Sequence, residues 1–379
     1  MTEPSASFPP LEKFAAPAAE ELCRRLEDGR IECLACGHRC RIAEGRSGVC
    51  RVRRVEGGVL RRPSGTVAGL ACDPIEKKPF YHAYPGRDAL TFGMLGCNFH
   101  CDYCQNWETS QALKDPETRA GLLEISAAEI VQAAVSSGAR AIVSSYNEPL
   151  ITADWAVEVF RLAKPRGLAC GFVSNGHATP EVLSYLRPYA ELFKVDLKGF
   201  REETYRRLGG RLSTVVDSIR KLKELGYWVE VVTLVVPGLN DDPGELREMA
   251  RFLAGVDPDI PWHVTAFHPD YRMLDRERTP PRALFEAWEI GRESGLRFVY
   301  PGNIAGFGDD RENTYCPGCG DLLIRRSGFA VLENRMAGGA CPRCGREIPG
   351  RWEEAPPRRS AGLGLPRRVR AGRRMGGEM

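Results

Sequence analysis

The sequence predicts an α/β fold, a partial (β/α)6 barrel flanked by two small Cys-rich modules. The first observation behind this prediction is that residues 88–302 alternate apolar runs of strand length with amphipathic runs of helix length. Such alternation is typical of βα units around a parallel sheet. The second is a length of 379 residues with 43% hydrophobic residues, enough for one barrel-sized core and small satellites. The third is that most of the 14 cysteines lie in three clusters, before, inside and after this region.

The alternating region sets the expected order of elements. Strands are expected at residues 89–95, 141–145, 170–174, 192–196, 229–235, 263–267 and 297–300. Helices are expected at residues 127–137, 153–163, 180–186, 214–225, 243–253 and 281–294. About six βα repeats suit an open, partial barrel.

The N-terminal part is predicted to contain an arm and a metal-binding module. Residues 1–20 are rich in Pro, Ala and Ser and are expected to form a disordered arm. Residues 21–87 form the Cys-rich module and lead into the barrel. The module carries a C-x2-C-x3-C-x9-C motif formed by Cys33, Cys36, Cys40 and Cys50. Four thiolates on tight turns favour a structural zinc site, with a second iron–sulfur cluster as the alternative.

A C-x3-C-x2-C triplet follows the first predicted strand of the barrel. Its members are Cys97, Cys101 and Cys104. Three thiolates can hold three irons of a four-iron cluster, which leaves the fourth iron open to a small molecule. The alternative is a zinc knuckle completed by His100 or a distant Cys.

The C-terminal part is predicted to contain a zinc-ribbon-like module and a tail. Residues 303–352 carry two C-x2-C pairs, formed by Cys316, Cys319, Cys341 and Cys344. Paired knuckles of this kind are typical of structural zinc sites. The tail, residues 353–379, is rich in Arg and is expected to be disordered, with contact to RNA as the alternative to a solvated tail.

The charge balance points away from several classes of partner. With 53 basic and 50 acidic residues, the net charge is +3, and no strong attraction to nucleic acid or membrane is expected. No run is long and apolar enough to span a bilayer, and the first residues lack the pattern of a signal peptide. Clustered cysteines in a chain of this size fit metal sites in a reducing compartment, so the cytoplasm is the expected location.

Short polar motifs follow the predicted strands at the points where the strands end. They are Tyr146 to Pro149, Ser174 to Gly176, Asp196 to Lys198, and His268. In parallel βα folds the loops at this edge converge on one mouth, where the chemistry collects. Alone, a polar residue after a strand is more often a helix cap or a turn former. The joint occurrence favours a common site, with His268 as the candidate catalytic residue and His82 and His263 as further candidates for holding substrate.

The triplet, with Tyr103 before its last Cys, resembles the radical S-adenosylmethionine (SAM) superfamily. The resemblance implies a partial TIM-type barrel, a [4Fe-4S] cluster on the triplet, and SAM that chelates the open iron through its amino and carboxylate groups. It also implies reductive cleavage of SAM to methionine and a 5′-deoxyadenosyl radical that abstracts hydrogen from a substrate. The SAM-contacting residues implied by the matching motifs are Tyr103, Asn147, Glu148, Ser174, Asn175, Asp196 and Lys198.

The motifs differ in how closely they match. The superfamily carries a Gly-Gly-Glu-Pro-like motif, whose carboxylate contacts the SAM amino group, where this chain has Tyr146, Asn147, Glu148 and Pro149. Because two glycines are replaced, the backbone part of that contact departs from the pattern. The segments Ser174 to Gly176 and Asp196 to Lys198 resemble motifs of glycyl-radical-enzyme activases that border the methionine and ribose of SAM.

A longer series of motifs is similar to the radical SAM member of the AmmeMemoRadiSam system. The matching segments are 72–86, 105–107, 146–149, 174–177 and 313–319, together with the two flanking Cys-rich modules. This resemblance implies an electron donor such as flavodoxin or ferredoxin, and Memo-like and AMMECR-domain proteins as partners. It names no substrate.

Four functions are compared on this basis. The leading hypothesis is a radical SAM enzyme that abstracts hydrogen from a substrate of the AmmeMemo pathway. The second is an activase that generates a glycyl radical on a partner enzyme. The Arg-rich tail suggests a third, RNA modification. The fourth is a zinc-binding module without catalysis.

Overall fold

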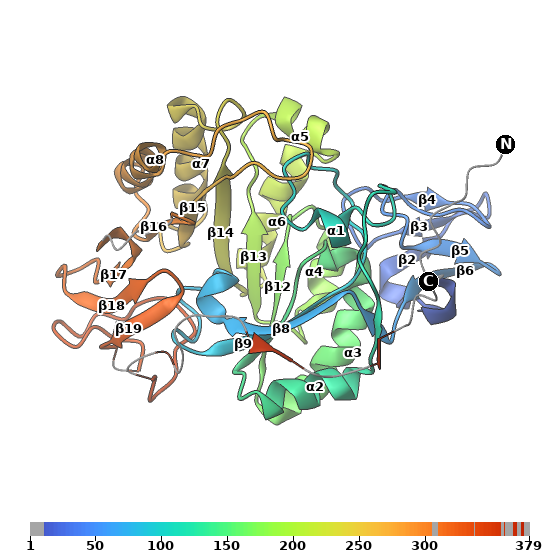
Figure 1. Cartoon of the computed structure of the whole chain (residues 1–379), viewed down its shortest axis with the longest axis horizontal. Helices are drawn as coiled ribbons and strands as arrows, with labels where there is room; N and C mark the ends of the chain where they lie inside the picture. The colour runs from blue at the N-terminus through green and yellow to red at the C-terminus, as the bar shows by residue number, and fades with distance from the viewer. Residues whose placement is uncertain are drawn as a thin grey trace.

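The computed structural model describes residues 11–304, 310–336, 338–357, 360, 367–369 and 373–374. A nine-stranded sheet forms its centre, with strand order β16-β15-β14-β13-β12-β11-β9-β8-β20 (Figure 1). The strands are β8 (Gly69–Pro74), β9 (Asp88–Gly93), β11 (Ala141–Ser144), β12 (Ala169–Ser174), β13 (Leu192–Asp196), β14 (Trp228–Val235), β15 (Trp262–Ala266), β16 (Val299–Gly302) and β20 (Arg367–Arg368). All neighbours from β9 to β16 pair in parallel, which confirms the predicted α/β class.

Helices connect successive strands of the sheet, as the sequence predicts. They are α1 (Trp107–Ser110), α2 (Ala127–Ser136), α3 (Ala153–Ala163), α4 (Pro180–Leu186), α5 (Glu202–Leu208), α6 (Leu212–Glu224), α7 (Pro243–Val256) and α8 (Pro281–Glu293). Side-chain caps fix several starts: Ser126 and Glu129 form a capping box at α2, and Asp242 caps α7. The two short helices α1 and α5 were not predicted from the sequence.

The sheet is open in the part of the chain that the structure describes. One edge is β16, and at the other edge β8 and then β20 add antiparallel strands instead of meeting β16. The sequence predicts that the barrel starts at residue 88, but the first strand of the sheet, β8, already begins at Gly69.

Both ends of the chain contribute strands that the sequence does not predict. Residues 11–17, placed by sequence in a disordered arm, form η1 (Leu11–Phe14) and β1 (Ala15–Pro17), which pairs with β6 (Val59–Pro63). Residues 1–10 of that arm lie outside the described residues. In the tail, β20 pairs with β8, and β21 (Arg373–Arg374) pairs with β10 (Leu123–Glu124). Disorder is thus a wrong prediction for these described segments.

Two small β modules flank the sheet on opposite sides (Figure 1). The N-terminal module contains β1, β2 (Cys23–Arg25), β3 (Ile31–Cys33), β4 (Arg41–Ile42), β5 (Arg54–Glu56) and β6; β7 (Thr66–Val67) pairs with β10. The C-terminal module contains β17 (Thr314–Tyr315), β18 (Leu322–Ser327) and β19 (Ala330–Asn334). Buried Arg326 joins the latter to the connection between β8 and β9, since its Nη2 donates to the Tyr81 carbonyl at 2.8 Å.

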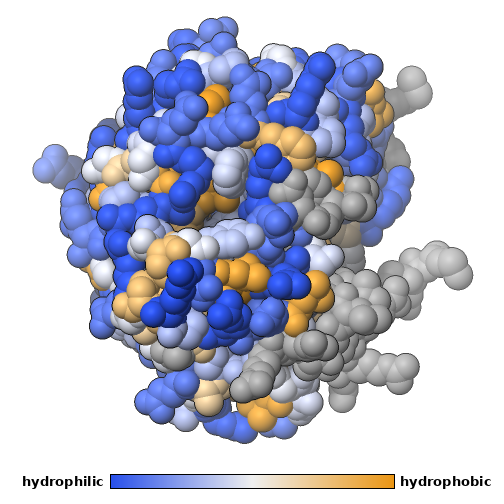
Figure 2. All heavy atoms as spheres, turned by 90° about the vertical axis from the view of Figure 1, so that its left-hand side faces the viewer, coloured by the Kyte–Doolittle hydropathy of each residue, from blue (hydrophilic) through white to orange (hydrophobic). Residues whose placement is uncertain are grey.

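The face that carries the C-terminal module is mostly hydrophilic, with apolar residues in small separated areas (Figure 2). Scattered apolar residues of this kind are normal on a protein surface. No helix among the described residues is long and apolar enough to cross a membrane.

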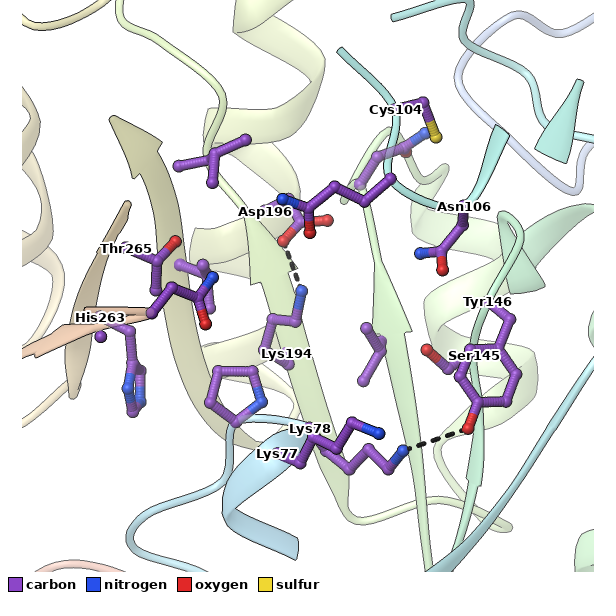
Figure 3. A pocket seen from close by; sticks show the side chains of 18 of the residues that line it. Lys77, Lys78, Cys104, Asn106, Ser145, Tyr146, Lys194, Asp196, His263 and Thr265 are labelled. Atoms are coloured by element: carbon purple, nitrogen blue, oxygen red, sulfur yellow. Dashed lines mark hydrogen bonds and ion pairs between the residues drawn. The ribbon is translucent and has the colours of Figure 1, made fainter. Parts of the chain in front are cut away.

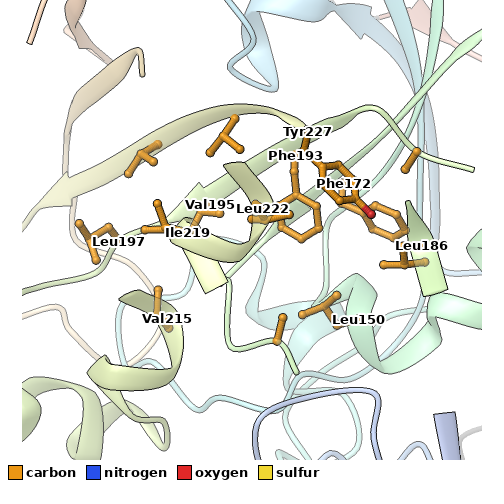
Figure 4. Close-up of a cluster of buried hydrophobic side chains, with 14 of the residues drawn as sticks. Leu150, Phe172, Leu186, Phe193, Val195, Leu197, Val215, Ile219, Leu222 and Tyr227 are labelled. Carbon is orange, nitrogen blue, oxygen red and sulfur yellow. The ribbon is translucent and has the colours of Figure 1, made fainter. Parts of the chain in front are cut away.

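The core and the opposite face of the sheet come from alternate residues of the same strands. On β13, Phe193 and Val195 lie in an apolar cluster with Phe172 and with Ile219 and Leu222 of α6 (Figure 4). Successive side chains of a strand point to opposite faces, so Lys194 and Asp196 point the other way. Burial of the apolar residues therefore fixes the direction of the polar ones.

A buried ion pair fastens the N-terminal module to α3. Arg53 pairs with Asp154, and both side chains are almost completely buried. Asp154 also accepts a hydrogen bond from the backbone N–H of Ala19 at 2.6 Å, and Arg53 Nε donates to the Ile151 carbonyl at 2.8 Å. Removing one member of such a pair leaves an uncompensated buried charge.

We therefore expect Asp154→Ala to lower the free energy of unfolding by about 3–5 kcal/mol, measured by urea denaturation. The matched control is Asp217→Ala, which removes an exposed pair with Arg220 and should cost at most about 1 kcal/mol. Equal losses in the two variants would contradict the anchoring role of Asp154.

Candidate active site

A cavity of about 750 Å³ opens at the carboxyl-terminal edge of the parallel strands. Nearly all residues that the sequence analysis selected for the cluster, SAM and catalysis line it. These are Cys97, Cys101, Tyr103, Cys104, Asn147, Glu148, Asn175, Asp196, Lys198 and His268. Parallel register brings them together although they span five separate loops.

The three thiols of the triplet lie in the loop between β9 and α1. Cys101 is buried, and Cys97 and Cys104 are half-buried. The backbone N–H of Phe99 donates to Cys97 Sγ at 3.3 Å, and Ser110 Oγ lies 3.2 Å from Cys104 Sγ. Burial raises the pKa of Cys101 to about 12, and the Lys198 ammonium opposes that rise.

This donor set fits the [4Fe-4S] cluster that the sequence resemblance implies. Three thiols border one cavity, and the side-chain N–H group of buried Asn98, next to Cys97, has no hydrogen-bond partner in the structure. Because buried polar groups are usually hydrogen-bonded, this N–H group is available to a group bound beside Cys97. Cys97, Cys101 and Cys104 would hold the cluster, with N–H and O–H donors already directed at two of the sulfurs.

The carboxylate of Glu148 is fixed by three donors. Ser174 Oγ and the Leu150 N–H donate to Oε1 at 2.7 and 3.0 Å, and the Asn175 N–H donates to Oε2 at 2.8 Å. Burial raises the pKa of Glu148 to about 7, despite the hydrogen bonds that lower it. Ser174 does not line the cavity and acts here by holding Glu148.

The residue that replaces the first glycine of the SAM-contacting motif keeps a glycine-like backbone. Tyr146 has φ of 69°, in the left-handed region. Its carbonyl accepts a hydrogen bond from Thr109 Oγ1 at 2.8 Å, and its hydroxyl donates to Asp73 at 3.1 Å. In the second replaced position, Asn147 Oδ1 accepts a bond from the Met94 N–H at 3.1 Å. Side-chain contacts therefore support the turn that glycines would otherwise permit.

The Asp196 side chain forms the centre of a charged group on the cavity wall. It pairs with Lys194, and Lys198 Nζ lies 3.4 Å from Oδ2 (Figure 3). Burial tends to lower the pKa of Lys198, but Asp196 and the nearby thiols of Cys101 and Cys104 raise it overall. Lys198 therefore stays cationic beside the triplet. Lys194 was not singled out from the sequence, although its position two residues before Asp196 places it on the same face.

A second basic group in the cavity was also missed. Lys77 and Lys78 follow β8, in η3 (Ile75–Lys77) and the residue after it, and both line the cavity (Figure 3). Lys78 pairs with buried Asp73, and Lys78 Nζ lies 3.4 Å from the Tyr146 hydroxyl. Burial lowers the pKa of Lys78 to about 8, against the effect of Asp73. Both lysines lie in the segment 72–86, which resembles the family in sequence, but that resemblance gave them no role.

The candidate histidines differ in position. His268 lines the cavity, where its Nδ1 lies 3.0 Å from Gln105 Nε2. His263 also lines the cavity, with Nε2 2.7 Å from Glu230. His82 does not line it and is buried between the Tyr300 hydroxyl and the Pro349 carbonyl, at 2.7 and 2.9 Å. The structure thus gives His82 a structural environment.

The two other Cys sets lie outside the cavity. The sulfur atoms of Cys316, Cys319, Cys341 and Cys344 all lie within 4.8 Å of one another, which matches the spacing of about 3.8 Å around one tetrahedral zinc ion. Cys33, Cys36, Cys40 and Cys50 lie in the N-terminal module, against the loop of the triplet.

The chain resembles known proteins over its central region and over most of its length. Residues 92–253 match the family described as the radical SAM superfamily. An uncharacterized protein of Methanocaldococcus jannaschii is 34% identical over 328 residues, which cover 86% of this chain and 96% of that protein. The pyruvate formate-lyase-activating enzyme of Staphylococcus epidermidis is 24% identical over 198 residues, or 48% of this chain and 76% of that enzyme.

Among solved structures, a radical SAM methyltransferase from Sphaerobacter thermophilus matches with a TM-score of 0.46 and 17% identity, over 63% of this chain and 71% of that one. The segment that matches the family contains the triplet and most of the strand ends that border the cavity. The family match and the relative from Methanocaldococcus jannaschii leave no support for a zinc-binding module without catalysis. The chain belongs to the radical SAM superfamily and is an enzyme of that type.

Proposed function

We propose that this enzyme binds a [4Fe-4S] cluster through Cys97, Cys101 and Cys104 and cleaves SAM to a 5′-deoxyadenosyl radical that abstracts hydrogen from a substrate in the same cavity. The observation that carries the proposal is the convergence of three thiols, a buried carboxylate and a cationic lysine on one space of about 750 Å³. When bound, the cluster supplies the electron for cleavage of the SAM sulfonium.

The protein's own residues bind and orient SAM. Glu148 is held by Ser174, Leu150 and Asn175, so that its carboxylate can accept a hydrogen bond from the SAM amino group without rearranging. Asn175 is fixed in turn, since its Nδ2 donates to Asn98 Oδ1 at 2.7 Å. Asn98 follows Cys97, so one chain of hydrogen bonds links Glu148 to the loop of the triplet. Because these side chains are held in place before SAM binds, the SAM sulfonium would lie at a fixed distance from the loop of the triplet.

The remaining SAM contacts come from the other strand ends. Lys198 stays cationic and suits the SAM carboxylate, and Asp196 suits a ribose hydroxyl. Tyr103 is buried against the same space and, with Asn147, completes the wall.

The substrate would occupy the part of the cavity bordered by the lysines Lys77 and Lys78, with Thr265 and His268 among the other polar groups. We assign the enzyme to the AmmeMemo pathway because the series of motifs from residue 72 to residue 319 resembles that family. Memo-like and AMMECR-domain proteins, and a flavodoxin or ferredoxin as electron donor, belong to this proposal.

A second candidate is activation of a glycyl radical enzyme. The observation that favours it is the similarity to proteins named pyruvate formate-lyase-activating enzyme over about half of this chain. In that case the substrate is a Gly of a partner protein. A glycyl radical EPR signal that forms only when SAM, reductant and such a partner are mixed would favour this candidate over the first.

For the C-terminal module we propose one structural zinc ion. The Sγ atoms of Cys316 and Cys344 lie 3.6 Å apart, and those of Cys319 and Cys341 lie 3.7 Å apart. Four thiols at such distances suit one tetrahedral ion, and they leave no open position for catalysis.

We expect Cys97→Ala to abolish formation of 5′-deoxyadenosine from SAM in anaerobically reconstituted, dithionite-reduced protein, because two thiols cannot hold the cluster in its working form. The product is quantified by liquid chromatography. Cys170→Ala, which removes a buried thiol of β12 outside the three sets, is the control and should retain activity. Wild-type protein that releases no 5′-deoxyadenosine would contradict the proposed function.

We expect Glu148→Gln to weaken SAM binding by about 1.5–3 kcal/mol, because it removes a charge-assisted hydrogen bond. Binding is measured by equilibrium dialysis with labelled SAM on the oxidised, reconstituted protein, where SAM is not consumed. The control is Glu158→Gln, which changes a carboxylate of helix α3 that does not line the cavity.

The affinity of the wild type should also depend on pH. The pKa of Glu148 is raised to about 7, so below that pH the carboxyl is protonated in SAM-free protein and must lose a proton to accept a hydrogen bond from the SAM amino group. The dissociation constant should therefore fall as pH rises through about 7, by up to about tenfold per unit. Glu148→Gln should lose this dependence, and an unchanged profile would remove Glu148 from the SAM site.

We expect Cys319→Ser to lower the zinc content by one ion per chain without changing the iron content, measured by elemental analysis. Loss of the ion should also unfold the C-terminal module at a lower temperature. If the variant keeps its zinc, the C-terminal set is not a zinc site.

A further inference from the structure

We infer that Cys33, Cys36, Cys40 and Cys50 hold a second iron–sulfur cluster, packed against the loop of the triplet so that it can pass an electron to that site. The inference rests on the proposed function for the receiving cluster. It concerns a set of thiols that the reaction with SAM does not itself require.

The spacing of the thiols distinguishes this set from the C-terminal one. Among the described residues, which include all of these cysteines, the C-terminal four are the one Cys, His, Asp or Glu group of three or more with its ligand atoms within 4.8 Å of one another. No three N-terminal thiols are that close, and neither are the three of the triplet. One zinc ion brings its sulfurs to about 3.8 Å, whereas a four-iron cluster holds each thiolate on a different iron and so further apart. Among the described residues, the N-terminal set and the triplet therefore both lack the close spacing of the C-terminal set.

The four N-terminal thiols nevertheless form one group. Cys33, Cys36 and Cys50 are buried, and Cys40 is half-buried. Burial raises the pKa of Cys36, and the charges of the other three thiols raise it further. Cys33 and Cys40 are likewise affected by their neighbours in the set. The four thiols therefore lie within electrostatic reach of one another.

Two buried polar side chains beside this set have unsatisfied donors. Arg53 is 1% exposed, its Nη1 has no hydrogen-bond partner, and its charge acts on the thiols of Cys33 and Cys50. His177 is also 1% exposed, and neither ring nitrogen has a partner. Its ring lies so close to Gly37, between Cys36 and Cys40, that a Cβ on Gly37 would be 2.9 Å from His177 Cε1. Buried donors without partners suit a negatively charged cluster, whose sulfurs accept hydrogen bonds.

The set is in direct contact with the loop of the triplet at two points. His38 Nε2 lies 3.1 Å from the carbonyl oxygen of Asn98, the residue after Cys97. The Cys50 carbonyl packs on Gly96, the residue before Cys97, where an added Cβ would be only 3.4 Å from that oxygen. Both sides of Cys97 are therefore contacted by residues of, or next to, the N-terminal set.

Lys114 contacts the loop of the triplet and is also affected by a thiol of the N-terminal set. Its Nζ donates to the carbonyl oxygens of Cys97 and Phe99 at 2.7 and 3.0 Å. Burial lowers the pKa of Lys114, and Cys97 and then Cys50 oppose this, so both thiols are within its electrostatic reach. One buried cation therefore acts on thiols of both sets.

The transfer balances as a one-electron relay. A low-potential one-electron donor reduces the N-terminal cluster, the same electron passes to the cluster at the triplet, and the N-terminal cluster returns to its oxidised state. Half-buried Cys40 places one edge of the set near the protein surface, where a donor can approach.

The first test removes the triplet. In reconstituted Cys97→Ala/Cys101→Ala/Cys104→Ala protein, we expect about four irons per chain, half the wild-type content, and a dithionite-reduced EPR signal that SAM does not change. Only the zinc of the C-terminal set should be present. A triple variant with no iron and a second zinc ion per chain would overturn the inference.

The reciprocal test keeps the triplet. We expect Cys36→Ser/Cys50→Ser to lose half of the iron and to keep the SAM-sensitive EPR signal, while reduction of that cluster by reduced ferredoxin, followed by stopped flow, becomes slower than in the wild type. The matched control is Cys23→Ser, since Cys23 pairs with Cys33 across β2 and β3 but its thiol contacts the carbonyls of Ala19 and Glu20. Unchanged iron content would show that this set holds no cluster. An unchanged reduction rate would show that the cluster does not pass its electron to the triplet site.

The outcomes separate this inference from the proposed function. If SAM changes no EPR signal of the wild type but the triple variant keeps its iron, the proposed function fails and the second cluster stands. If the wild type responds to SAM and the triple variant holds only zinc, the proposed function stands and the second cluster fails.

Discussion

The buried carboxylate of Glu148 holds together the loops that form the cavity. It accepts hydrogen bonds from Leu150 in its own loop and from Ser174 and Asn175 after β12, and Asn175 continues the chain to Asn98 beside Cys97. A buried carboxylate without donors would be costly, so the three loops are bound to one arrangement. The raised pKa of Glu148 shows that the donors do not fully compensate its burial, which leaves the site suited to one more positive partner.

The parallel sheet supplies the precision that this arrangement needs. Along β13, Phe193 and Val195 are buried under the helices, and this directs Lys194 and Asp196 into the cavity. A change in strand register would exchange the core residues for the charged ones, so packing of the core protects the geometry of the site. The apolar core and the charged wall are therefore encoded in the same short segments.

The parts of the fold that could be predicted from sequence are those with local signals. The triplet and the strand-end motifs were located because parallel βα units repeat with clear apolar periods, and the strands from β9 to β16 appear within a few residues of their expected bounds. Strand pairing between segments that are far apart in the chain produces no such apolar period in the sequence. For that reason the antiparallel β8, which brings Lys78 and Asp73 to Tyr146, and the pairing of β20 with it were not predicted. Likewise, four-Cys motifs alone do not give the sulfur spacing that distinguishes the C-terminal set from the N-terminal one.

The central claim is that SAM binds next to the triplet with its amino group at Glu148. The most direct test is electron–nuclear double resonance on the dithionite-reduced protein with SAM labelled with nitrogen-15 in its amino group. The account predicts a hyperfine coupling between the reduced cluster and the labelled nitrogen. SAM that binds to the protein without any such coupling would contradict it.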